Sequence, residues 1–179
     1  MQHNNIYIPT SVTSMMKKVV WENKSNKQLC ATIPKNSGIK AGDVVNIEKE
    51  KINKIVYSSI VGNPFHYGHL HFLQAANELG DLHICGVLTD SALKEYRGEN
   101  KHNFKERSAM VISNRCVDMV MPQNNINPGE NLKKIHEQFP RAKIILVHGD
   151  NWKKIIGEEE VKKLKGEAIK LLYYKKLSE

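Results

Sequence analysis

The distribution of apolar residues indicates alternating strands and helices over the last two thirds of the chain. Residues 55–61 form a largely apolar run that ends at a Gly-Asn-Pro turn, which predicts a buried strand. Apolar residues then recur with helical spacing until Gly80 closes the pattern, at Leu70, Leu73, Ala76 and Leu79. The sequence therefore predicts a strand, a tight turn and a helix in direct succession.

The alternation continues to the C-terminus. A continuous apolar run at 84–88 predicts a second buried strand, which Thr89 and Asp90 follow. Ligands of open parallel sheets bind beyond the carboxyl ends of the strands, so both residues are expected near a site. We predict a loop at 91–103. Beyond it we predict strands at 115–122, 143–147 and 168–174, and helices at 105–112, 131–139 and 158–165.

The residues before 54 follow a different pattern. Residues 1–16 are polar without a clear period, which predicts a loosely ordered arm. Residues 17–53 contain short apolar runs separated by Asn, Gly and Asp, which predicts strands and turns. So small a module has little core of its own, and we expect it to pair with a second copy. The predicted divisions are therefore 1–16, 17–53 and 54–179.

Composition and charge narrow the class of protein. The 179 residues are 40% hydrophobic and 26% charged, as in ordinary globular proteins, and the net charge of +8 favours anionic partners. The three cysteines, Cys30, Cys85 and Cys116, lack metal-ligand spacing, which indicates reduced thiols. The sequence contains no apolar run of transmembrane length and no signal-peptide pattern. We therefore expect a cytoplasmic protein that does not associate with a membrane.

Two histidines mark the place where the first strand gives way to a helix. His66 and His69 are three residues apart, so both imidazoles can lie on one helix face. Gly68 between them allows a ligand to approach the backbone. The helix N-terminus also offers unpaired N–H groups and partial positive charge, which suit a phosphate. These features together predict a site for a nucleoside triphosphate.

Three stretches resemble one enzyme family. The His66-Tyr67-Gly68-His69 motif resembles the HxGH signature of the nucleotidyltransferase superfamily, where it follows the first strand of a Rossmann-like sheet. Residues 105–122 resemble the ER…R-x-VD…P stretch of its cytidylyltransferase branch. Residues 148–152 resemble the branch's HGDDW motif, with Asn151 in place of the second Asp. The resemblance covers about 55–174 and implies a doubly wound parallel α/β sheet.

The resemblance also implies a reaction and a site. CMP would pass from CTP to a small phosphorylated or phosphonylated alcohol or amine with release of pyrophosphate, with Mg²⁺ held mainly by the triphosphate and not by side chains. The implied catalytic residues are His66, His69 and Arg115. The implied nucleotide-binding residues are these three together with Val61, Gly62, Asn63, Tyr67, Gly68, Gly149, Asp150, Asn151 and Trp152.

The acceptor is expected on the loop after the second strand. Arg97-Gly98 falls where the family has a Lys-Gly that contacts the acceptor's phosphate, and Asp90 and Lys94 are expected beside it. An exposed arginine in a turn is the alternative interpretation of Arg97. We interpret Arg107 as holding the start of its own helix through local pairs, and Asp118 as structural.

Two stretches depart from the family pattern. The branch usually has Gly-x-Phe-Asp before HxGH, where this chain has Ile60-Val61-Gly62-Asn63. The branch also continues with an Arg-Thr-x-Gly-Ile-Ser-Thr-Thr element after the last strand, which is not found in the final residues of this sequence.

The N-terminal module resembles a second family. Residues 31–35 and 38–45 resemble the Ile-Pro-Lys and Gly-Asp elements of the AbrB/MazE-like swapped-hairpin domain, which implies an all-β homodimer. Eight lysines against four acidic residues in 17–53 make DNA binding an alternative, which we favour less than dimerisation. The alternatives for the whole chain are a DNA-binding regulator with a degenerate nucleotide domain and an adenylyltransferase that uses ATP.

Overall fold

The computed structural model describes residues 21–22, 29–30, 38–41, 43, 51–98, 101–150 and 152–172. The chain divides into two units, Met1–Asp43 and Val44–Glu179. In the first unit, β1 (Trp21–Glu22) pairs antiparallel with β2 (Leu29–Cys30), and Trp21 lies opposite Cys30. Most of the predicted swapped-hairpin domain lies outside the described residues, so that domain and its dimer stay predictions.

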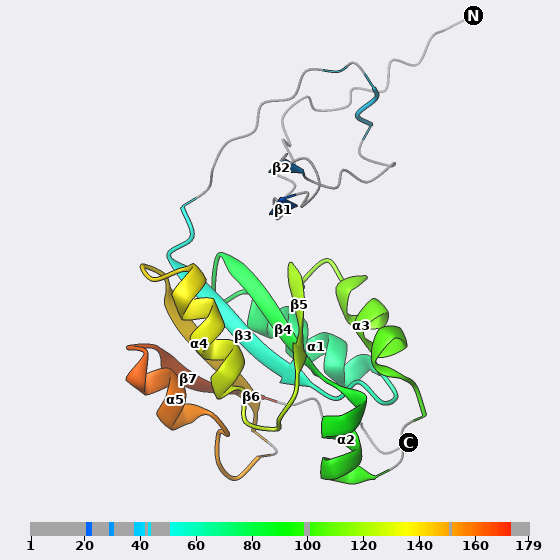
Figure 1. Ribbon diagram of the computed structural model, residues 1–179, viewed down its shortest axis with the longest axis vertical. Helices are drawn as coiled ribbons and strands as arrows, with labels where there is room; N and C mark the ends of the chain where they lie inside the picture. The colour runs from blue at the N-terminus through cyan, green and yellow to red at the C-terminus, as the bar shows by residue number, and fades with distance from the viewer. Residues whose placement is uncertain are drawn as a thin grey trace, which may run out of the picture. The chain divides into compact units, whose positions relative to one another are not determined.

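The second unit contains a five-stranded parallel sheet (Figure 1). Its strands are β3 (Lys54–Ile60), β4 (Leu82–Leu88), β5 (Met119–Gln123), β6 (Lys143–Gly149) and β7 (Glu167–Leu171). They lie in the order β5-β4-β3-β6-β7, so the chain builds outward from β3 first on one side and then on the other. This reversal leaves a crevice between the carboxyl ends of β3 and β6, where ligands of such sheets bind.

Helices cover both faces of the sheet, and their apolar residues form two cores. Helices α1 (Tyr67–Asn77) and α3 (Phe104–Ile112) pack on the face to which Val56 and Ile60 of β3 belong. Helices α4 (Gly129–Gln138) and α5 (Glu158–Lys163) contribute to the other core, with Ile55 and Tyr57 of β3. In Figure 1, α4 lies in front of the sheet and α1 behind it. The predicted doubly wound α/β fold is confirmed for this unit.

The predicted loop at 91–103 is wrong in its first half, which forms helix α2 (Asp90–Arg97). The Thr89 hydroxyl caps this helix by accepting the Ala92 N–H at 3.4 Å, and Ala92 and Leu93 are buried beside Leu88. A threonine followed by Asp and Ser is an ordinary helix-start signal. The helix places regularly spaced side chains at the carboxyl edge of the sheet, where an irregular loop was expected.

Strand β5 starts at Met119, four residues later than the predicted strand at 115–122. Before it, the chain turns, with the Val117 N–H donating to the carbonyl of Asn114. Asp118 accepts the His83 N–H at 2.8 Å, which ties the start of β5 to the start of β4 and confirms its structural role. Arg115 therefore lies in the turn at the amino end of β5 and is exposed.

A buried polar network joins the sheet to α4 and to the loop after β5. The Tyr57 hydroxyl donates to Oε1 of Gln123 at 2.8 Å and accepts from Nδ2 of Asn131 at 2.9 Å. Burial raises the pKa of Tyr57, so the hydroxyl stays protonated. Gln123 in turn donates to the carbonyls of Asn125 and Ile126 at 2.9 and 3.2 Å. Residues 124–126 are thereby fixed at the edge of the crevice.

Among the helices in the described part of the chain, none has both the length and the apolar character needed to cross a membrane.

We predict that Gly86→Ala lowers the free energy of unfolding by about 1–3 kcal/mol, the usual cost of overpacking a core. A Cβ at Gly86 would overlap the Tyr57 hydroxyl and Oε1 of Gln123. Urea unfolding of the wild type, Gly86→Ala, Tyr57→Phe and the double variant forms a double-mutant cycle. Because Tyr57→Phe removes one overlapping atom, it should cost less in the Gly86→Ala background. Full stability of Gly86→Ala would show that this contact does not limit packing.

Candidate functional site

A cavity of about 200 Å³ lies at the carboxyl ends of the strands. It is lined by residues from the loop after β3, from α1 and α2, and from β6 and the loop that follows, including Val61, Asn63, His66, His69, Tyr96, Arg97, His148, Gly149 and Trp152. The cavity thus occupies the switch point at which sheets of this topology bind ligands. A nucleotide site was predicted at the same place.

His66 and His69 cap the first turn of α1 reciprocally. Nδ1 of His66 accepts the Gly68 N–H at 3.1 Å, and Nδ1 of His69 accepts the His66 N–H at 3.3 Å. Both Nδ1 atoms are therefore acceptors, which assigns the proton of each neutral ring to Nε2. The ring centroids are 4.0 Å apart. The helix start thereby fixes two imidazoles side by side, each with an Nε2–H donor.

The pair carries a particular charge state. Burial, and after it the nearby His66 and Arg97, lower the pKa of His69 to about 4, so this ring is neutral at neutral pH. The Phe65 ring stacks on His69 with centroids 5.5 Å apart and holds its orientation. Arg97, from the end of α2, lines the same cavity as the two histidines. The described lining of the site therefore combines a neutral His69 with the permanently charged Arg97.

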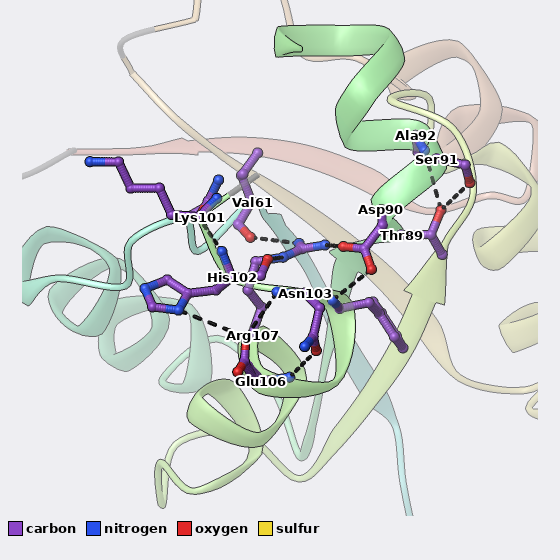
Figure 2. Close-up of polar contacts among 12 residues, drawn as sticks. Val61, Thr89, Asp90, Ser91, Ala92, Lys101, His102, Asn103, Glu106 and Arg107 are labelled. Atoms are coloured by element: carbon purple, nitrogen blue, oxygen red, sulfur yellow. Dashed lines mark hydrogen bonds and ion pairs between the residues drawn. The ribbon is translucent and has the colours of Figure 1, made fainter. Parts of the chain in front are cut away.

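The loops around the cavity are held by the buried side chain of Arg107 (Figure 2). Its Nη1 donates to the carbonyl of Val61 at 2.9 Å, its Nε to the carbonyl of His102 at 3.0 Å, and its Nη2 to Asp90 at 2.8 Å. The other Asp90 oxygen accepts the Phe104 N–H. Our interpretation of Arg107 as a source of only local pairs is wrong, because its contacts with Val61 and Asp90 join the loop after β3 to the start of α2.

The loop after β3 is fixed from a second side. Oδ1 of Asn63 accepts the N–H groups of Lys101 and His102, both at 3.2 Å. Gly62 has a positive φ of 64°, a conformation that suits glycine. The stretch that departs from the family's Gly-x-Phe-Asp pattern thus has a defined shape, in which Asn63 takes the part of a loop anchor.

Aromatic rings form one wall of the cavity. Tyr96 from α2 stacks on Trp152 with centroids 6.1 Å apart, and Trp152 meets His148 edge-on at 5.6 Å. The Arg97 guanidinium lies 5.1 Å from the centre of the Tyr96 ring, a cation–π contact. Nε2 of His148 donates to the carbonyl of Ile156 at 3.2 Å, and burial lowers the pKa of this histidine. The wall joins α2 to the loop after β6.

The structure gathers half of the twelve predicted nucleotide-binding residues at this cavity. Six of them line it, namely Val61, Asn63, His66, His69, Gly149 and Trp152, and so does Arg97, which was predicted to contact the acceptor. Gly68 supplies the capped N–H, and Gly62 lies within the same loop. Tyr67 is 59% exposed, and Asp150 is exposed just after β6. Asn151 lies outside the described residues.

Three predicted residues are placed differently. Arg115 is not brought to the histidines, because it precedes β5 and so lies at the amino ends of the strands. Lys94 is exposed and does not line the cavity. Asp90 is engaged by Arg107 and the Phe104 N–H, so it serves the loop structure.

Sequence reasoning missed Tyr96, Gln123 and Ile126, which also line the cavity. For Tyr96 a signal existed, because a helix beginning at Asp90 places it one turn after the buried Ala92. Gln123 and Ile126 gave no such signal.

A family model described as cytidylyltransferase-like matches residues 63–174. The match covers the histidine motif and the strands and helices from α1 to β7, and begins after β3. The chain belongs to the cytidylyltransferase-like family. Its family and its Rossmann-like fold are those of a nucleotidyltransferase-type enzyme.

Individual relatives are similar over part of their length. The bifunctional protein HldE of Helicobacter hepaticus is 30% identical over 118 residues, which are 64% of this chain and 23% of that protein. The protein of the same name from Helicobacter pylori strain Shi470 is 34% identical over 113 residues, 61% of this chain and again 23% of that protein. The chain therefore spans about a quarter of the length of these curated relatives.

A solved structure supports the fold. The lipopolysaccharide core biosynthesis protein from Thermoplasma volcanium GSS1 superimposes with a TM-score of 0.59 at 18% identity. The superposition covers 70% of this chain and 100% of that one. At this identity the likeness concerns the fold alone.

We predict that Arg107→Met destabilises this cytidylyltransferase-like protein by about 3 kcal/mol, because breaking a buried ion pair costs roughly 3–5 kcal/mol. The low end is expected because the side chain of Asp90 is 46% exposed and can be rehydrated. Arg107→Lys keeps the charge but not the three-way contact, and should recover only part of the loss. Urea unfolding measures both. A loss below about 1 kcal/mol for Arg107→Met would contradict the role given to this residue.

We also predict that His69 makes stability depend on pH. Its pKa is about 4 in the folded protein, against about 6.5 for an unperturbed histidine. Between these values the unfolded state binds more protons, so stability falls as the pH falls from about 6.5 toward 4. His69→Gln keeps an acceptor for the helix cap and cannot be protonated. Unfolding at about pH 7 and about pH 5 should show a smaller loss in this variant than in the wild type. Equal losses would exclude His69 as a source of the dependence.

Proposed function

We propose that the chain transfers a nucleotidyl group from a nucleoside triphosphate, with CTP as the first candidate, to a small phosphorylated alcohol or amine, releasing pyrophosphate. The observation that carries this proposal is the reciprocal cap of His66 and His69, which presents two Nε2–H donors at the N-terminus of α1. Donors fixed before the substrate arrives need no reorganisation during the reaction.

The proposed reaction does not require proton abstraction. An oxygen of the acceptor's phosphate, already anionic, forms a bond to the α-phosphorus while the bond to the β-phosphate oxygen breaks. Negative charge accumulates on the α-phosphate oxygens and on the departing pyrophosphate. The protein's part is to align the two phosphates and to donate hydrogen bonds to this charge. Neutral imidazoles with Nε2–H groups suit that part, and the N-terminal N–H groups of α1 add to it.

Arg97 is the proposed contact for the acceptor's phosphate. It lines the same cavity as the histidines and comes from a different element, the end of α2. A guanidinium can bind two phosphate oxygens at once. Because Arg97 and His69 line one cavity, we propose that they serve the two phosphates that react with each other.

The side chains that line the cavity bear on how Mg²⁺ would bind there. Its described lining residues include neither Asp nor Glu. Across the described part of the chain, no three His, Cys, Asp or Glu side chains come together as a metal site. Mg²⁺ prefers oxygen ligands and commonly binds through substrate phosphates. We therefore propose that it enters with the triphosphate, where it would screen the phosphate charge.

The direct experiment is pyrophosphate release by the purified chain. CTP and ATP are each combined with glycerol 3-phosphate, phosphoethanolamine, phosphocholine and an aminoalkylphosphonate. Turnover with CTP supports the proposal as stated, and turnover with ATP alone supports the adenylyltransferase alternative. No turnover and no binding of either nucleotide would overturn the proposed function.

We predict that His66→Asn and His69→Gln each lower kcat/KM by at least about a hundredfold, the usual effect of losing one preorganised donor. Both replacements retain the helix cap, because Asn is a good N-cap and Gln is a natural partner at the third helical position. Each variant lacks an imidazole Nε2–H. Thermal unfolding serves as the control and should stay close to that of the wild type. Near-normal turnover in either variant would refute the role of that histidine.

A further inference from the structure

The side chain of Arg97 is not fixed by hydrogen bonds. Arg97 is the last residue of α2 and is exposed, and the helix ends at Gly98, which follows it. Within the described part of the chain, no hydrogen bond or ion pair engages its guanidinium. A long side chain at a helix end has many rotamers, and fixing one of them costs conformational entropy. Whatever restrains Arg97 therefore decides how well it can bind a phosphate.

The ring of Tyr96 supplies a restraint. The Arg97 guanidinium lies 5.1 Å from the centre of this ring. Neighbouring residues of a helix do not face each other, so the arginine side chain has to fold back over the ring to reach it. A cation–π contact uses the charge of the guanidinium and leaves its N–H groups available for hydrogen bonds. Arg107 is the opposite case, because its Nε, Nη1 and Nη2 all donate within the protein.

Tyr96 is held in turn by the loop after β6. Its ring is 37% exposed and stacks on the Trp152 ring with an interplanar angle of 19°. Trp152 meets His148 edge-on, and its backbone N–H donates to the carbonyl of Gly149 at 3.3 Å. Both of these partners belong to β6, a buried strand of the sheet. A continuous series of ring contacts therefore runs from the sheet to the guanidinium of Arg97.

We propose that Tyr96 and Trp152 are positioning residues, which hold Arg97 in the orientation that binds the acceptor's phosphate. The inference rests on the proposed nucleotidyl transfer. It gives Trp152 a different part from the one that the family resemblance implies, in which this residue contacts the nucleotide. Loss of either ring weakens acceptor binding and leaves nucleotide binding intact.

The chemistry of the Tyr96 contact separates positioning from simple packing. Phenylalanine keeps an aromatic face for the guanidinium and a ring to stack on Trp152. Leucine keeps apolar bulk but offers a cation no ring face. If Tyr96 only filled space, leucine would serve nearly as well as phenylalanine. If Tyr96 positions Arg97, phenylalanine rescues function and leucine does not.

The test compares Tyr96→Phe, Tyr96→Leu and Trp152→Leu, each alone and combined with Arg97→Ala. Calorimetric titration with inorganic phosphate, glycerol 3-phosphate and phosphoethanolamine reports binding without turnover. Pyrophosphate release with both substrates varied gives the two KM values, and thermal unfolding shows that each variant is folded. Met110→Ala is the matched control, because it removes an exposed apolar side chain from α3 that does not line the main cavity.

We expect Tyr96→Leu and Trp152→Leu to raise the acceptor's KM and Kd about threefold to thirtyfold, the effect of losing one cation–π contact, while the nucleotide's KM stays unchanged. In the Arg97→Ala background Tyr96→Leu should have no effect, because the side chain that it positions is gone. Tyr96→Phe and Met110→Ala should match the wild type. An unchanged acceptor Kd in Tyr96→Leu, an additive effect in the Arg97→Ala background, or an effect of Trp152→Leu on the nucleotide alone would overturn the inference.

The inference and the proposed function fail in different ways. Phosphate binding that depends on both Arg97 and Tyr96, without turnover of CTP or ATP, would overturn the proposed function and leave an anion site organised by the two rings. Turnover with an acceptor Kd that does not depend on Tyr96 would overturn the inference alone. Binding of all three phosphate probes that does not depend on Arg97 would also overturn the inference.

Discussion

One buried guanidinium determines the shape of the site. The side chain of Arg107 is fully buried, and a charge in that position is tolerated only with good partners. Its partners are Asp90, at the start of α2, and the carbonyls of Val61 and His102, which belong to two different loops. Only arginine offers several N–H donors in one rigid plane. The same three hydrogen-bonding contacts therefore satisfy its charge and hold the loop after β3 against the start of α2.

The start of α1 shows how local helix chemistry prepares a binding surface. A helix leaves its first N–H groups without intrahelical partners, and here two histidines supply the caps through Nδ1. Asn at position 66 and Gln at position 69 could satisfy the backbone equally well. Imidazoles, however, carry a second nitrogen on the far side of the ring. The cap therefore sets the tautomer, the ring orientation and the donor direction together, and it does so without help from a distant residue.

How much the sequence could predict depends on the distance over which each interaction acts. The buried strands β3, β4 and β6 follow from their continuous apolar runs, and His66 and His69 follow from a motif of four residues. Helix α2 was missed although Thr89 gave a start signal, because the expected family loop was preferred to it. The positions of Arg107 and Arg115 relative to the site could not be predicted, for a different reason. Arg107 and Val61 are 46 residues apart, and no local pattern reports which arginine will meet a carbonyl at that distance. Tyr57, Gly86 and Gln123 pack together from three neighbouring strands. This packing cannot be predicted from the sequence until the register of the strands is known.

The two sides of the main cavity differ in charge, and the difference has a physical reason. Arg97 is always protonated, and it disfavours a proton on the nearby His69. If His69 were charged as well, two cations would share a partly desolvated space, which would be costly. A neutral His69 avoids that cost while its Nε2–H group still donates. In the proposed reaction, a phosphate bound near His69 and Arg97 would change this balance, because negative charge nearby raises the pKa of an imidazole. The hydrogen bonds from His69 would then strengthen with the negative charge they meet, which is the behaviour required of a group that stabilises charge as it develops.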